Sequence, residues 1–126
     1  MDMKGKNQIP TFPISTYPNG QGKCWRGKEY WKESTLWEAA KDLTPFEIPI
    51  VALDTSFSPW ELENINQIVY HFDRVSKVES RYPIILDEFG NVRDGFHRIL
   101  KAITEGKSTI KAVRLNIMPP IDGKDK

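Results

Sequence analysis

The 126-residue sequence has only one cysteine and two histidines. The single Cys24 excludes an internal disulfide and any metal site built from several cysteines. Two histidines without a cysteine cluster also argue against a zinc site. We therefore expect no resident metal site, and the low cysteine count is typical of a cytoplasmic protein.

Strong net charge and long apolar runs are absent as well. The net charge is +1, from 18 Lys and Arg against 17 Asp and Glu, which gives no global attraction to nucleic acid or membrane. No apolar run approaches the roughly 20 residues that a transmembrane helix needs, so we expect no membrane association. The polar residues 1–6 are not typical of a signal or transit peptide. Any phosphate binding must therefore come from a local site.

Several common signatures are also missing. The sequence contains neither the GxxxxGK[ST] phosphate loop nor the GxGxxG dinucleotide motif. No basic helix suggests reading of the DNA major groove. A cysteine nucleophile would depend on Cys24, which is far from both histidines in the sequence.

Composition divides the chain into three segments. Residues 1–33 form an arm rich in Pro, Gly and Lys, residues 34–116 carry regular apolar patterns, and residues 117–126 read as a flexible tail. The arm holds aromatic residues that a plain disordered tail would lack. We expect part of it to lie against the body, against a protein partner or against a second copy in a homodimer.

Local signals predict three helices. Capping-box spacing from Thr35 to Glu38 predicts a first helix that ends near Leu43. Ser58 and the Pro and Glu that follow it predict the start of a longer helix that ends near Val78. A third helix is predicted from residue 95 to Gly106.

Runs of branched apolar residues predict strands over 46–53, 83–87, 91–93 and 109–115. Asp87 and Glu88 most simply belong to the turn between the second and third of these strands. The expected order is helix, strand, helix, hairpin, helix, strand. The sequence therefore predicts an α+β domain with a small mixed sheet and helices packed mainly on one face.

The most informative motif is Asp94-Gly95-Phe96-His97-Arg98, between the hairpin and the third helix. A glycine lets the backbone approach a ligand closely, and a helix start presents free N–H groups and the positive end of a dipole. The His and Arg side chains add donors, so the motif predicts a phosphate site. The plainer alternative is an N-cap Asp, a glycine for a tight turn, and a solvated His–Arg pair; Asp94 and Arg98 are also spaced to form a pair.

Two further groups are candidates for the same site. His71 and Arg74 lie three apart on the long helix and off its apolar stripe, where they add phosphate donors or form an ordinary polar face. Asp54 and Glu61 flank Trp60, and either carboxylate suits a general base or a Mg²⁺ ligand. A capping role explains Glu61 equally well.

Residues 82–102 closely resemble the ParB/sulfiredoxin superfamily of ParB-like nuclease domains. That pattern has an apolar strand, an acidic-Gly hairpin, and then D-G-x-H-R at a helix start. Residues 46–50 resemble the first strand of the family and residues 110–113 its closing strand. The resemblance implies a ParB/sulfiredoxin-like fold. It also implies that Gly95, His97 and Arg98 bind the phosphate of a nucleotide (ATP, ADP or CTP, with or without Mg²⁺).

The sequence departs from the pattern of two family branches. Sulfiredoxins carry a cysteine between the Gly and His of the motif, where this chain has Phe96, which argues against sulfinic-acid reduction. Partition proteins continue into a helix-turn-helix domain, which we do not expect after the last predicted strand. The chain most resembles the small free-standing members of bacteria and phages.

Three functions remain open from the sequence. The leading hypothesis is a nucleotide-phosphate-binding domain acting as a phosphotransferase or nucleotide hydrolase, with His97 and either Asp54 or Glu61 in the chemistry. The second is a DNA-binding accessory protein or nuclease that uses the same phosphate site, assisted by the locally basic arm. The third is a non-catalytic interaction module that docks through the aromatic arm.

Overall fold

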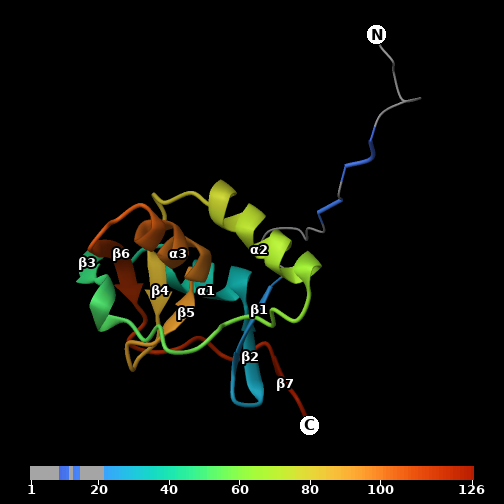
Figure 1. The fold of residues 1–126 in the computed structure, drawn as a ribbon. Helices are drawn as coiled ribbons and strands as arrows, with labels where there is room; N and C mark the ends of the chain where they lie inside the picture. The colour runs from blue at the N-terminus through green and yellow to red at the C-terminus, as the bar shows by residue number, and fades with distance from the viewer. Residues whose placement is uncertain (1–8, 12, 15–21) are drawn as a thin grey trace.

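The protein is described by a computed structural model that covers residues 9–11, 13–14 and 22–126. Over these residues the chain forms two small β-sheets and three α-helices, an α+β arrangement (Figure 1). The elements in chain order are β1 (Lys23–Arg26), β2 (Glu29–Lys32), α1 (Glu33–Ala40), β3 (Phe46–Pro49), a 3₁₀ turn (Ile50–Ala52), α2 (Ile65–Lys77), β4 (Ile84–Leu86), β5 (Val92–Asp94), α3 (Phe96–Thr104), β6 (Thr109–Arg114) and β7 (Gly123–Lys124). None of the helices in these ranges is long and apolar enough to span a membrane.

The central sheet has four strands in the order β3-β6-β4-β5. β6 runs parallel to β4, whereas β3 and β5 are antiparallel to their neighbours. The sheet is therefore mixed, as the sequence predicted. β4 is buried at every position, which fits its unbroken run of Ile84, Ile85 and Leu86, because a strand covered on both faces needs no polar alternation.

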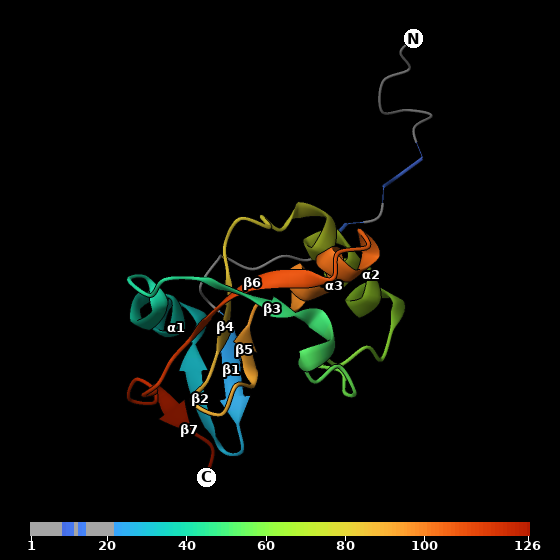
Figure 2. The ribbon, with the colours of Figure 1, turned by 90° about the vertical axis from the view of Figure 1, so that its left-hand side faces the viewer.

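Helices cover both faces of this sheet (Figure 2). On one face, α3 packs against β4 and β6 and is itself covered by α2; Ile84 and Leu86 face this side together with Ile99. On the opposite face lies α1. The sequence predicted helices mainly on one face and so missed this second layer. The layer covers Ile85, the middle residue of β4, which points away from α3.

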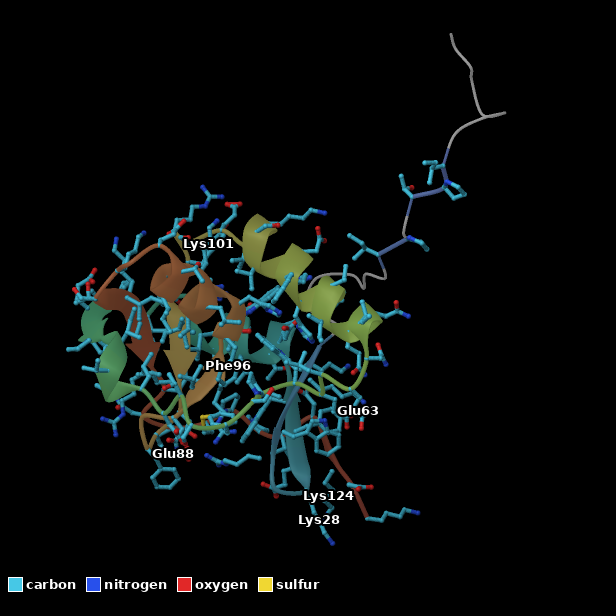
Figure 3. All side chains as sticks on the ribbon, viewed as in Figure 1. Lys28, Glu63, Glu88, Phe96, Lys101 and Lys124 are labelled. Carbon is cyan, nitrogen blue, oxygen red and sulfur yellow. The ribbon has the colours of Figure 1, made fainter. Side chains whose placement is uncertain are left out.

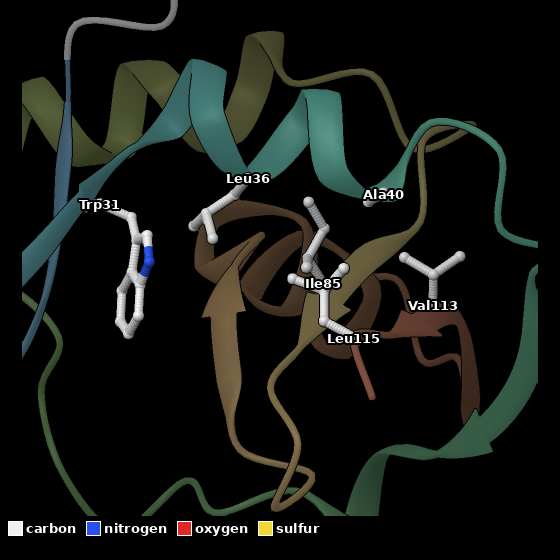
Figure 4. Close-up of a cluster of buried hydrophobic side chains, with 6 residues drawn as sticks. All are labelled: Trp31, Leu36, Ala40, Ile85, Val113 and Leu115. Carbon is white, nitrogen blue, oxygen red and sulfur yellow. The ribbon is translucent and has the colours of Figure 1, made fainter. Parts of the chain in front are cut away.

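The core on the α1 side is built around Trp31 and Leu36, which are 1% and 0% exposed. Figure 4 shows the six residues of this cluster, drawn from β2, α1, β4, and β6 with the residue that follows it: Trp31, Leu36, Ala40, Ile85, Val113 and Leu115. The Trp31 indole N–H donates to the carbonyl of Pro119 at 2.8 Å. The residue that seals this core therefore comes from the segment expected to be an arm.

A second, three-stranded sheet joins both ends of the described chain. β2 pairs antiparallel with β1 on one side and with β7 on the other, and β2 leads directly into α1. The segments expected as an arm (1–33) and a flexible tail (117–126) thus contribute strands to one sheet. Of the expected arm, residues 1–8, 12 and 15–21 lie outside the described part of the chain.

Two predicted helix starts are wrong. α1 begins at Glu33, so Thr35 lies within the helix. Its N-cap residue is Lys32, and no side-chain hydrogen bond caps the helix. α2 begins at Ile65 rather than after Ser58; the Asn64 side chain accepts a hydrogen bond from the Gln67 N–H at 2.9 Å. The Ser58 hydroxyl instead donates within its own loop to the Trp60 carbonyl at 2.7 Å. Strand β3 is shorter than predicted because its backbone turns into a 3₁₀ helix after Pro49.

Candidate functional site

The turn from β5 to α3 depends on Gly95. Its φ of +111° lies in the left-handed region, and a Cβ there would lie 2.6 Å from Cγ2 of Ile84. Other residues rarely adopt this φ, and none has room for a side chain at this contact. The glycine of the motif is thus explained by the tight strand-to-helix turn.

Asp94 does not cap α3, contrary to the prediction. Gly95 is the N-cap residue and no side chain caps the helix. The Asp94 carboxylate instead accepts from the Arg98 guanidinium at 3.0 Å and from the Trp37 indole N–H at 3.1 Å. The predicted pairing of Asp94 with Arg98 is confirmed, although the pair is largely buried rather than solvated, with side chains 10% and 12% exposed.

Because Asp94 is occupied, the first turn of α3 keeps free donors. Within the described part of the chain, no hydrogen bond uses the backbone N–H of Phe96, His97 or Arg98. These groups lie at the positive end of the helix dipole. They are the strongest feature of the site for an anion.

The two histidines of the chain meet in space. Nδ1 of His71 and Nε2 of His97 lie 2.9 Å apart, close enough for one ring to donate to the other. Trp60 stacks on both rings, with centroid distances of 4.1 Å to His71 and 4.3 Å to His97. α2, α3 and the loop before α2 are joined through these three rings.

Both imidazoles favour their neutral form. Burial, assisted by the nearby His71, Arg74 and Arg98, lowers the pKa of His97 to about 4. Burial, assisted by the charge of Arg74, also lowers the pKa of His71. At neutral pH His97 is therefore an uncharged donor or acceptor, and the positive charge beside it comes from arginine.

Arg74 supplies a cation next to the histidine pair. It is half-buried on α2, and no hydrogen bond or ion pair within the described residues engages its guanidinium. The structure brings His71, which the sequence grouped with Arg74, next to His97, and both residues lower the pKa of His97. Neither lines the pocket described next; they reach it through His97 and Trp60.

A pocket of about 490 Å³ opens at the start of α3. Phe96, which is labelled near the centre of Figure 3, is one of its walls. Three further aromatic rings line it, those of Trp25, Phe57 and Trp60, and the backbone of Gly95 and His97 reaches it from α3. The Phe96 ring meets Phe57 and Trp60 edge-on, with centroid distances of 5.8 and 6.3 Å.

Most charged side chains that line the pocket already have hydrogen-bond or ion-pair partners within the protein. Arg93 donates to Asp87 at 2.8 Å, and Asp94 is held by Arg98. The carboxylate of Glu33 accepts from the Gly22 N–H at 3.2 Å. The pocket is therefore not strongly cationic, and an anion bound there depends on N–H dipoles more than on net charge.

Asp54 lines the pocket as the sequence grouping proposed. Its Oδ1 accepts from the hydroxyl and the backbone N–H of Ser56, and these hydrogen bonds hold its pKa below the usual value. Glu61 does not line it: with α2 starting later than predicted, Glu61 is an exposed loop residue. No group of three or more His, Cys, Asp or Glu side chains among the described residues is arranged to hold a metal ion.

Arg98 is also not among the described residues that line this pocket. Its guanidinium extends toward Asp94 instead, so only its backbone N–H belongs to the start of α3. Of the five-residue motif, Gly95, Phe96 and His97 form the pocket, together with Asp94 as a wall. Asp87 and Glu88 serve the turn, as expected: Asp87 is fully buried and accepts from the N–H groups of Phe89 and Asn91, both at 2.9 Å.

Several pocket residues were missed by sequence reasoning, among them Phe57, Cys24 and Trp25. Cys24 and Trp25 lie on β1 and line the same pocket as His97, although Cys24 had been set aside as distant in sequence. Burial raises the pKa of the Cys24 thiol, so the thiol is protonated at neutral pH. The aromatic residues of a Pro- and Gly-rich segment were the available signal, but they did not indicate which part of the body they would contact.

Comparison with known proteins adds no relative: the sequence matches no family profile, no curated protein and no solved structure.

Proposed function

We propose that the protein binds a nucleotide (ATP, ADP or CTP) in the pocket at the start of α3. The observation that carries this proposal is the combination of free N–H groups and aromatic rings in one pocket of about 490 Å³. That volume lies within the roughly 300–1,000 Å³ typical of small-molecule sites. A nucleotide has a charged and a flat part, which match the two kinds of wall.

The aromatic walls suit the base. Trp25 is 46% exposed and lines the pocket, whereas Trp60 is already covered on one side by the two histidines. Stacking of a base on an aromatic ring contributes about 1–3 kcal/mol. Trp25 and Phe57 are the two exposed aromatic walls, and of these Trp25 offers a base the larger ring.

The start of α3 suits the phosphates. The N–H groups of Phe96 and His97, the two helix residues that line the pocket, act together with the helix dipole on an anion. His97 assists as a neutral hydrogen-bond partner rather than as a cation, since its pKa is about 4. The hydrogen-bonded His71–His97 pair also provides a proton acceptor for phosphoryl transfer or hydrolysis, with Arg74 beside it to balance negative charge.

Mg²⁺ fits this pocket because net positive charge is lacking there. Asp54 is exposed and ionised at neutral pH, and its Oδ2 takes part in no hydrogen bond within the described residues. Mg²⁺ usually binds one or two carboxylates together with the phosphates of a nucleotide. Asp54 is the residue that would hold the ion, and the ion would neutralise the phosphates.

The proposal includes membership of the ParB/sulfiredoxin superfamily. The mixed sheet supports this membership. In it the hairpin β4–β5 leads through Gly95 into α3, and β6 lies parallel to β4. The position of Phe96 in the pocket supports binding without sulfur chemistry at that residue.

Calorimetric titration of the full chain with ATP, ADP and CTP, with and without Mg²⁺, tests the proposal. We expect saturable binding of at least one nucleotide, weakened at least tenfold when Mg²⁺ is omitted. Asp54→Asn should weaken the Mg²⁺-dependent binding, whereas Glu61→Gln, in the same loop but outside the pocket, should not. Folded protein that binds none of the three nucleotides would exclude the proposal.

Substitution of Trp25 tests the stacking directly. We expect Trp25→Ala to weaken nucleotide binding about tenfold, which corresponds to about 1.4 kcal/mol. Phe89→Ala is the matched control, because Phe89 is an aromatic residue 74% exposed and outside the pocket. Equal affinities for the two variants would show that the base does not stack on Trp25.

A further inference from the structure

A second, smaller hollow lies where the start of β6 meets the loop before β4 and the inner side of α3. Its volume is about 230 Å³. Four cationic side chains line it: Arg81, Arg98, Lys107 and Lys111. The only carboxylate in its lining is Glu47, which lies opposite Lys111 in the pairing of β3 with β6. Positive charge is therefore in excess within this hollow.

Arg98 is the fixed part of the hollow. Its side chain is 12% exposed and held by Asp94 through one terminal nitrogen. Its Nε is buried without a hydrogen-bond partner, and no hydrogen bond within the described residues uses Nη1. The ion pair with Asp94 thus leaves much of the guanidinium unsatisfied, while it keeps the group in place for a ligand.

The other three cationic side chains are more exposed than Arg98. Lys111 has no ion pair within the described residues. Arg81 pairs with Glu79 at 2.9 Å and Lys107 with Glu105 at 3.6 Å, and both pairs are well exposed. Arg81 also donates to the Tyr82 hydroxyl at 3.1 Å and lies over the Tyr82 ring. Exposed pairs of this kind contribute about 0–1 kcal/mol, so exchanging them for a buried anion costs little.

We propose that this hollow binds a small divalent oxyanion, of which inorganic phosphate and sulfate are the simplest. Its volume is below the roughly 300–1,000 Å³ of typical small-molecule sites, which favours a single tetrahedral anion over a nucleotide. Ser80 and Thr109 line the hollow, no side-chain hydrogen bond of either is present in the described part of the chain, and their hydroxyls complete its set of donors. The proposal does not rest on the nucleotide pocket, which has a different lining.

An NMR titration of the ¹⁵N-labelled full chain tests this inference. Phosphate and sulfate are added in separate titrations at constant ionic strength. We expect saturable shifts of the amide signals of Lys107, Thr109 and Lys111 with both anions. Arg81→Gln and Lys111→Gln, both on exposed side chains, should each weaken binding at least threefold. Lys28→Gln should leave it unchanged, because Lys28 lies at the turn of the β1–β2 hairpin and outside the hollow (Figure 3).

Two outcomes would overturn the inference. Shifts confined to residues 95–97 would place the anion at the start of α3 rather than in the second hollow. Shifts that grow linearly without saturation, or an equal loss of affinity in Lys28→Gln, would show a general attraction of the anion to basic side chains.

Discussion

At the scale of single residues, the neutral state of His97 decides what it can contribute. Its ring is covered by Trp60 and hydrogen-bonded to His71, so protonation would place a charge in a half-buried site next to Arg74. The D-G-x-H-R pattern alone suggests a cationic donor. The structure instead makes the arginines the cations and His97 an uncharged partner.

The ionisation of His97 can be measured directly. We expect its C2–H signal to titrate with a pKa of about 4, and that of His71 below its usual value as part of the same coupled pair. NMR spectra recorded between pH 3.5 and 8 check this. A His97 signal that titrates near pH 6.5 would contradict the buried pair.

The free energy of unfolding should depend on pH through the same His97 side chain. Because the folded pKa of His97 is lowered from 6.5 to about 4, the unfolded chain binds a proton first as the pH falls. The free energy of unfolding should therefore decrease from about pH 6.5 toward pH 4. Urea unfolding of the wild type and of His97→Gln at pH 7 and pH 4.5 measures the effect, and the variant should lose less stability over this interval. Equal losses would assign the pH dependence to other groups.

Gly95 makes a second prediction at this scale. Gly95→Ala should destabilise the fold by about 2–4 kcal/mol, because it forces a β-carbon into the left-handed region and against Ile84. Gly90→Ala is the control: its φ is +85° but nothing lies within 4 Å of the added carbon, so about 1 kcal/mol is expected. If denaturant unfolding gave equal losses, the contact with Ile84 would not matter.

At the scale of elements, Asp87 joins two hairpins. It closes the β4–β5 turn through backbone N–H groups and also accepts from Arg93 at 2.8 Å and from Arg26 of β1 at 3.5 Å. Burial opposes its ionisation, but the hydrogen bonds from Asn91, Arg93 and Phe89 outweigh it and hold the pKa of Asp87 below its usual value. Asp87 thereby links the β4–β5 hairpin, which leads into the pocket, to β1, which carries Trp25.

Removal of the Asp87 charge should loosen this connection. Asp87→Asn should cost about 3 kcal/mol, because it leaves the largely buried Arg93 without its carboxylate partner. Glu88→Gln removes a neighbouring carboxylate that is more exposed and pairs with Arg26, and it should cost about 1 kcal/mol or less. Thermal or urea unfolding compares the two; a similar loss for both would contradict the central role of Asp87.

The sequence predicted the type of most elements but not the start of two helices. The apolar runs of β4 and β6 and the glycine stop of α3 were sufficient signals because they reflect local chemistry. Ser58 with Glu61 and Asn64 with Gln67 both have capping-box spacing, and the helix begins after Asn64. Local spacing does not decide between the two. For the same reason Glu61 was assigned to the site and Asp54 was not preferred over it.

At the scale of the whole molecule, the described ends of the chain complete the fold. β1, β2 and β7 form one sheet, and Trp31 closes the core beside α1 while bonding to Pro119. Long-range pairing between residues about 90 positions apart leaves no mark in local composition, so the sequence divided these segments from the domain. It also could not show that β1 brings Cys24 and Trp25 to the pocket.

Truncation tests this dependence. Removal of residues 117–126 should expose Trp31, shift its fluorescence to longer wavelength and lower the free energy of unfolding by several kcal/mol. Removal of Lys126 alone, which is exposed and bonds only to the neighbouring Asp125 in the described residues, should change neither property. An unchanged spectrum after the longer truncation would show that β7 and Pro119 do not stabilise the core.

Nucleotide binding in the pocket at the start of α3 is the function that we propose. Its most direct test is an NMR titration of the ¹⁵N-labelled chain with ATP, ADP and CTP, each with Mg²⁺, that follows backbone amides and indole N–H groups. We predict that at least one nucleotide causes saturable shifts of Phe96, His97 and the Trp25 indole, with little change at Lys28. Nucleotide-induced shifts that bypass residues 95–97, or no shifts with any of the three, would contradict the account.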